Sequence, residues 1–170
     1  KRVGEEVAEM QALADKQKAG ITIEPWDYYY YAEKVRQNKY KLDEKEVRRY
    51  FAVDSVRRGI FTMAEKLYGV KFTEIPDAPK YDPSVTVYDV TDAASGEHVA
   101  VFMTDYFSRP SKRQGAWMSE FKGSWQKADG TSSRPIIYNV GNFSRPTADA
   151  PALLTLDEVE TMFHEFGHGL

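Results

Sequence analysis

Cysteine is absent from the 170 residues, and histidine occurs only three times. Without a thiol the chain can form neither a disulfide nor a thiolate metal site. No apolar run approaches the roughly 20 residues that a bilayer-crossing helix needs. The net charge of only −3 gives no electrostatic reason to bind nucleic acid or an anionic membrane. No internal repeat and no low-complexity tract interrupts the chain.

The composition is that of a globular protein, with 42% hydrophobic and 14% aromatic residues. Apolar residues recur at helical spacing from Val3 to Ala14, and three further helices are expected by Gly69. Each of the three has a local start or stop signal. These signals are Asp27 before YYYYAEKVRQNKY, the capping-box pair Asp43 and Glu46, and Gly69 after a segment beginning near Asp54.

The hydrophobic pattern changes after Gly69 from helical spacing to the alternation typical of strands. SVTVYDVT and EHVAVFMTDYF are separated by the turn-forming DAASG and predict a hairpin. GAWMSEF and PIIYNVGNF are two further strand candidates, and the polar KGSWQKADGTSSR between them is expected to be a loop. We therefore predict an α+β fold, with helices in residues 1–70, a mainly antiparallel β part in 71–154 and a final helix in 155–170.

The final helix carries the clearest functional signal. Thr155 and Glu158 form a capping-box pattern, and TMFHEFGHGL contains HExxH as His164, Glu165 and His168. At about 100° per residue the two histidines lie some 40° apart on the helix and can bind one ion. Zinc bound by two such nitrogens lowers the pKa of water, and a flanking carboxylate can accept its proton. The spacing therefore predicts a zinc hydrolase site.

An HExxH match can also arise by chance, in which case the histidines are ordinary surface or core residues. Two local features oppose that interpretation. The motif uses two of the three histidines, and its inner residues, Phe166 and Gly167, are uncharged. An apolar stripe separate from the histidines is expected to hold the helix against a core. The stripe consists of Leu156, Val159, Phe163, Phe166 and Leu170.

Longer segments extend the similarity beyond HExxH. FHEFGHGL resembles the active-site helix of the thimet-oligopeptidase family of zinc peptidases. KRQGAWMSEF, IIYNVGNFSRP and PALLTLDEVETMFHEFGHGL follow in that family's order. EPWDYYYYAEKVRQNKYKLDEKEVRRYF resembles its helical region, so the resemblance covers nearly the whole chain. TMFHEFGHGL together with IIYNVGNF most resembles the family's bacterial peptidyl-dipeptidase branch.

The resemblance implies that His164 and His168 are zinc ligands and that Glu165 is the catalytic base. The family's third ligand, a glutamate on a following helix, has no counterpart up to Leu170. We therefore expect a fragment of a catalytic domain that holds zinc weakly or not at all and is inactive alone. The intact enzyme is expected to bind one zinc ion, to cleave oligopeptides and to be cytoplasmic. The fragment is expected to be able to self-associate through the apolar stripe of its last helix.

The strand candidate PIIYNVGNF precedes the active-site helix by one loop. In zincins an edge strand near that helix binds extended substrate through its backbone, as in strand addition. Gly141 would permit a close approach of the peptide. We therefore expect the backbone of Asn139, Val140 and Gly141 to face substrate, against the alternative of a buried strand.

Three alternatives to a peptidyl-dipeptidase stay open. The first is an endopeptidase of the oligopeptidase type in the same family. The second is a different HExxH hydrolase, such as an aminopeptidase. The third is a non-catalytic α+β interaction module in which HExxH is accidental. The residues present do not report which peptide terminus is recognised.

Overall fold

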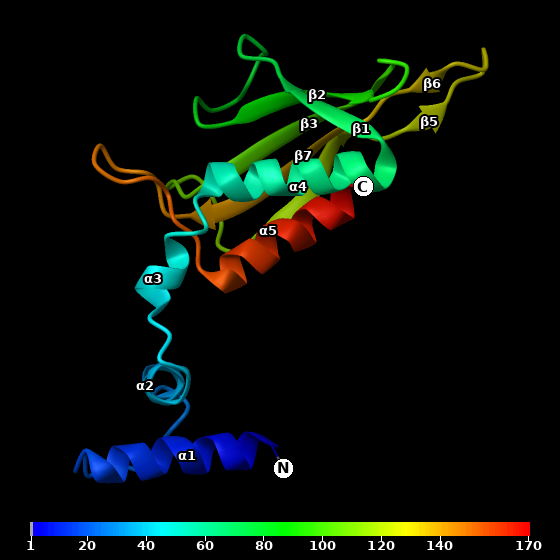
Figure 1. The fold of residues 1–170 in the computed structure, drawn as a ribbon. Coiled ribbons are helices and arrows are strands. Elements are labelled where there is room, and N and C mark those ends of the chain that lie inside the picture. Colours follow the sequence, from blue (N-terminus) through cyan, green and yellow to red (C-terminus); the bar gives the residue numbers. More distant parts are fainter. Residues whose placement is uncertain (1) are drawn as a thin grey trace. The chain divides into compact units, whose positions relative to one another are not determined.

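The computed structural model of the chain describes residues 2–170, which fall into two compact units. The first unit extends to Val47, and the second runs from Arg48 to Leu170. The boundary between the units lies within the segment that the sequence predicted to be helical. Both units are seen in Figure 1. No helix among residues 2–170 has the length and apolar character needed to cross a membrane.

The first unit is a pair of packed helices, α1 (Arg2–Lys16) and α2 (Tyr28–Tyr40). Its small core consists of Met10, Ala14 and Tyr31, while Tyr29 is strongly exposed. The expected side-chain cap of α2 is wrong in detail. Asp27 occupies the N-cap position, but its carboxylate accepts a hydrogen bond from the Glu24 amide instead. The short α3 (Glu44–Arg48) follows.

The second unit contains α4 (Val53–Tyr68), a mixed sheet and α5 (Leu156–Gly169). Gly69 ends α4 in the left-handed region with φ 66°, as the sequence predicted. The strand order of the main sheet is β1-β2-β3-β7-β4. The five strands are β1 (Val70–Glu74), β2 (Thr86–Asp92), β3 (His98–Phe107), β7 (Ile136–Phe143) and β4 (Trp117–Lys122).

The α+β class and the β2–β3 hairpin are confirmed, and three details differ from the sequence analysis. β1, which pairs with β2, was not predicted. The segment expected to be a loop contains a small hairpin, β5 (Trp125–Gln126) with β6 (Ser132–Ser133). β3 and β7 pair in parallel, so the sheet is mixed. The chain passes through β4 and this hairpin before β7, which is long enough for a parallel crossover.

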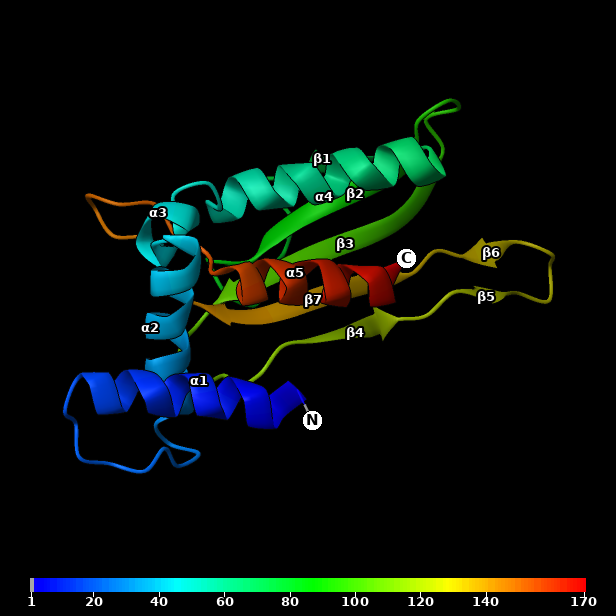
Figure 2. The ribbon, with the colours of Figure 1, turned by 60° about the horizontal axis from the view of Figure 1, so that its bottom comes forward.

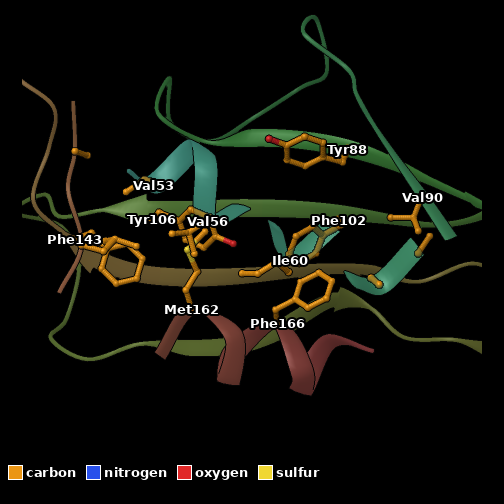
Figure 3. Close-up of a cluster of buried hydrophobic side chains, with 14 residues drawn as sticks. Val53, Val56, Ile60, Tyr88, Val90, Phe102, Tyr106, Phe143, Met162 and Phe166 are labelled. Carbon is orange, nitrogen blue, oxygen red and sulfur yellow. The ribbon is translucent and has the colours of Figure 1, made fainter. Parts of the chain in front are cut away.

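The main core lies between one face of the sheet and the two helices α4 and α5, which Figure 2 shows on the same side of the sheet. Alternate residues of each strand enter this core, since Tyr88 and Val90 belong to it while Val87 packs on the opposite face. Figure 3 shows Met162 and Phe166 of α5 directed toward Ile60 of α4 and Phe102 of β3. This packing fixes α5 against the sheet and so sets the position of HExxH.

Candidate active site

The helix α5 begins with the capping box that the sequence predicted. The Thr155 hydroxyl accepts from the Glu158 amide at 3.1 Å, and the Glu158 carboxylate accepts from the Thr155 amide at 2.7 Å. Two carboxylates in the first turn, those of Asp157 and Glu158, also complement the helix dipole. The start of α5 is therefore fixed by local interactions.

Burial divides α5 into two sides. Met162 and Phe166 are buried, whereas His164 and His168 are exposed on the opposite side. The predicted apolar stripe is only partly correct. Val159, Phe163 and Phe166 belong to or pack against the core, but Leu156 and Leu170 are exposed and Met162 was overlooked. The buried face of α5 is therefore centred on Met162 and Phe166, and the histidines remain accessible.

The two histidines converge on one point. Their Nε2 atoms are 3.0 Å apart, and their ring planes are nearly perpendicular at 88°, with centroids 4.6 Å apart. A tetrahedral zinc ion with Zn–N bonds of about 2.0–2.1 Å would hold two nitrogens about 3.3 Å apart. The pair therefore fits two ligands of one zinc ion with only a small change in side-chain position. Glu165, half-buried, lies between them in sequence on the same helix.

The described part of the chain, residues 2–170, contains no cluster of three histidine, cysteine, aspartate or glutamate side chains placed to hold a metal. His98, the remaining histidine, lies on β3 and pairs with Asp89 of β2 at 2.6 Å. This cross-strand pair gives His98 a structural role. Residues 2–170 thus bring together two imidazole nitrogens that could bind one metal ion, and a carboxylate follows the first histidine on the same helix.

The strand β7, expected at the edge of the sheet, is instead an interior strand. It pairs with β3 on one side and with β4 on the other, and Asn139, Val140 and Gly141 are buried. The edge-strand premise is therefore wrong, because strand order depends on pairings between distant segments that local pattern does not encode. Contact between these three residues and a peptide remains a prediction, but the edge position on which it was based is not observed.

The edge next to the active-site helix belongs to β4. This strand has β7 as its neighbour on one side and ends the strand order. Met118 of β4 and His168 line one cleft of about 440 Å³, which also contains Glu120 and Phe166 and is otherwise mainly apolar. GAWMSEF was predicted to be a strand, but nothing in its local pattern indicates an edge position.

The loop before β4 is held by two side chains. The Asn142 amide donates to the carbonyls of Arg113 and Gly115 at 2.8 and 2.7 Å. The buried Lys112 ammonium donates to the carbonyls of Asp105 and Phe107, and also to that of Gly141. These contacts fix the point at which β4 begins beside β7.

Comparison with known proteins gives the family of the chain. Residues 1–170 match the family described as Peptidase family M3. The chain is 44% identical over 170 residues to the dipeptidyl carboxypeptidase of Escherichia coli, covering 99% of the chain and 24% of that relative. It is 38% identical over 165 residues to oligopeptidase A of Salmonella typhimurium, with 97% and 24% covered.

The chain therefore belongs to peptidase family M3. A plant relative, the organellar oligopeptidase A of Arabidopsis thaliana, is 37% identical over 173 residues, covering 98% of the chain and 22% of the relative. The chain spans about a quarter of the length of the curated relatives it matches. The family resemblance inferred from the sequence is confirmed.

Proposed function

We propose that the protein containing this chain is a zinc-dependent peptidase that releases dipeptides from the C-terminus of oligopeptides. The observation that carries the proposal is the convergence of the His164 and His168 Nε2 atoms beside Glu165 on an anchored helix. The name of the Escherichia coli relative supports dipeptide release. Oligopeptidase A relatives support a second candidate, an endopeptidase acting within oligopeptides.

His164 and His168 would hold the zinc ion through Nε2, and the exposed face of α5 leaves it open to substrate. When bound, zinc supplies Lewis-acid polarisation of the scissile carbonyl and activation of water. Glu165 would accept the proton from the attacking water and deliver it to the leaving amine nitrogen. A general acid–base group of this kind contributes about 10²–10⁴-fold to the rate.

A catalytic zinc site normally has three protein ligands. Residues 2–170 supply two, so we place the third ligand elsewhere in the protein. Because one ligand is missing, these 170 residues alone would not hydrolyse peptides.

We further propose that substrate adds as a strand to the open edge of β4 in place of the expected β7. Strand addition requires unpaired backbone N–H and C=O groups, and β4 has them on the side away from β7. The proposal is supported by the cleft that Met118 of β4 shares with His168. A complex of the full-length enzyme with a peptide analogue bound away from β4 would contradict this assignment.

The test of the function is Glu165→Gln in the full-length zinc-loaded protein, assayed on fluorogenic oligopeptides. We expect turnover to fall about 10³-fold with bound zinc retained, because Gln cannot accept the proton. Unchanged turnover would show that HExxH is not the catalytic group.

Matched peptides with a free or an amidated C-terminus separate the candidate specificities. Loss of cleavage on amidation supports dipeptide release. Cleavage at an internal bond of the amidated peptide supports the endopeptidase, and removal of single residues from a free N-terminus supports an aminopeptidase.

A further inference from the structure

Asn139 is the polar member of an otherwise apolar face of β7. Alternate residues of this strand, Ile137, Asn139, Gly141 and Phe143, point to the side covered by α5. The Asn139 side chain is fully buried, at 0% exposure. A polar amide at such a position is costly unless both its donor and its acceptor are hydrogen-bonded.

The donor of Asn139 is used and its acceptor is not. Its Nδ2 donates to the peptide carbonyl of Glu165 at 2.8 Å. Its Oδ1 is buried and has no hydrogen-bond partner among residues 2–170. If Nδ2 and Oδ1 were exchanged, Oδ1 would face the carbonyl oxygen of Glu165, and neither atom could donate a hydrogen bond. The Glu165 carbonyl therefore fixes the orientation of the Asn139 amide.

This contact falls within HExxH itself. One helical turn later, Gly169 lies so close to β7 that a Cβ atom there would approach the Ile137 side chain to 3.1 Å. The turn that carries Glu165 and His168 is therefore fixed to β7 at two points, one polar and one by close packing. A leucine would fill the place of Asn139 without an unpaired acceptor, so stability alone does not explain the amide.

We propose that Asn139 is a positioning residue for the catalytic helix. Its amide fixes the peptide unit of Glu165, and thereby the direction in which the Glu165 carboxylate and the His168 imidazole leave the helix. The inference rests on the proposed peptidase function and replaces the expected backbone role of Asn139 with a side-chain role. A positioning role affects kcat more than KM, because it acts on the catalytic groups of α5 while the backbone pairing of β4 with β7 is kept.

The test compares Asn139→Leu and Asn139→Ala with Val87→Ala in the full-length zinc-loaded enzyme. Val87 is buried in the cluster on the opposite face of the sheet, so its truncation lowers stability without reaching α5. We expect both Asn139 variants to lose about 10-fold in kcat with KM nearly unchanged. Val87→Ala should retain kcat for each folded molecule.

Two measurements on the zinc-free protein are independent of activity. Asn139→Leu should unfold at a temperature equal to or above that of the unsubstituted protein, because it removes the unpaired Oδ1. Backbone amides of residues 165–169 should exchange hydrogen faster, since the hydrogen bond that joins that turn to β7 is lost.

A kcat of Asn139→Leu and Asn139→Ala within twofold of the unsubstituted enzyme would overturn the proposal. So would a fall in kcat no larger than that of Val87→Ala at equal loss of stability. Glu165→Gln keeps the two proposals separate. If Glu165→Gln abolishes turnover and the Asn139 variants do not lower kcat, only the positioning role is wrong.

Discussion

Two polar clusters in the second unit differ in how far their hydrogen-bonding groups are satisfied. The Asp105 carboxylate, in a residue only 1% exposed, accepts hydrogen bonds from Nη1 and Nη2 of Arg109 at 2.7 and 2.8 Å and from the Tyr81 hydroxyl at 3.0 Å. Lys112 adds a bond of 3.2 Å to the same carboxylate. In the HExxH cluster, by contrast, His164 and His168 face solvent and bond to each other.

The difference separates a structural cluster from a chemical one. The bonds of Asp105 and Lys112 join the ends of β3 and β7 to the loops before β2 and after β3, and they use both carboxylate oxygens of Asp105. The Nε2 atoms of the two histidines bond to each other, and within residues 2–170 the nearby Asn139 keeps an unpaired oxygen. Satisfied buried polar groups specify the fold, whereas an unsatisfied buried group needs an explanation other than fold stability.

The largest effect on stability is expected for Asp105→Asn. The substitution keeps the shape but leaves the Lys112 ammonium, with its side chain 4% exposed, without a buried counter-charge. Breaking one side of a buried ion pair costs about 3–5 kcal/mol. Urea unfolding should show this loss, while Asp89→Asn, at a half-exposed pair with His98, should cost under about 1 kcal/mol. Equal losses for the two substitutions would remove the distinction between the buried cluster and a surface pair.

Acid should weaken the same cluster. Burial alone would raise the pKa of Asp105, but the hydrogen bonds from Arg109 and Lys112 outweigh it and hold the pKa below its usual value. A carboxyl whose pKa is depressed on folding stabilises the protein above the unfolded-state pKa of about 3.9 and loses that contribution as the pH falls. The difference in unfolding free energy between the unsubstituted protein and Asp105→Asn should therefore shrink below about pH 4. A difference that stays constant from pH 7 to pH 3 would contradict the depressed pKa.

Local signals in the sequence predicted one of the two clusters. HExxH and the capping box of Thr155 and Glu158 depend on spacings within one helix, and these spacings can be taken directly from the sequence. The Asp105 cluster depends on the ends of β3 and β7 meeting, as their parallel pairing brings about. From the sequence, Arg109 and Lys112 look like ordinary loop charges.

The same limit explains the error over the edge strand. The alternation of apolar and polar residues predicted that PIIYNVGNF and GAWMSEF are strands. The same alternation occurs in central and in edge strands, so it could not predict which of the two lies at the edge. Their order is set by β7 pairing with β3 and β4 together. The role of Asn139 was hidden for the same reason, since its partner Glu165 is 26 residues away.

A smaller effect is expected at the start of α5. Thr155→Ala removes the hydroxyl that accepts from the Glu158 amide, and losing such a cap typically costs about 1 kcal/mol. Urea unfolding would measure it, with Thr62→Ala on α4 as the control. The Thr62 hydroxyl donates to the Arg58 carbonyl within its own helix and caps nothing. A loss for Thr155→Ala no larger than for Thr62→Ala would show that the capping box does not stabilise α5.

The smallest effect is expected from adding zinc to these 170 residues alone. Two histidines supply fewer ligands than the three of a normal catalytic site, so we expect dissociation constants well above about 10 µM. Binding at about 10 µM zinc would then stabilise the folded chain by less than about 0.5 kcal/mol. Calorimetric titration and thermal unfolding with and without zinc measure both quantities, and His164→Gln should abolish the residual binding. Sub-micromolar binding of one zinc ion by the monomer, lost in His164→Gln, would mean that the described residues already complete the site. The HExxH cluster would then be as fully satisfied as that of Asp105.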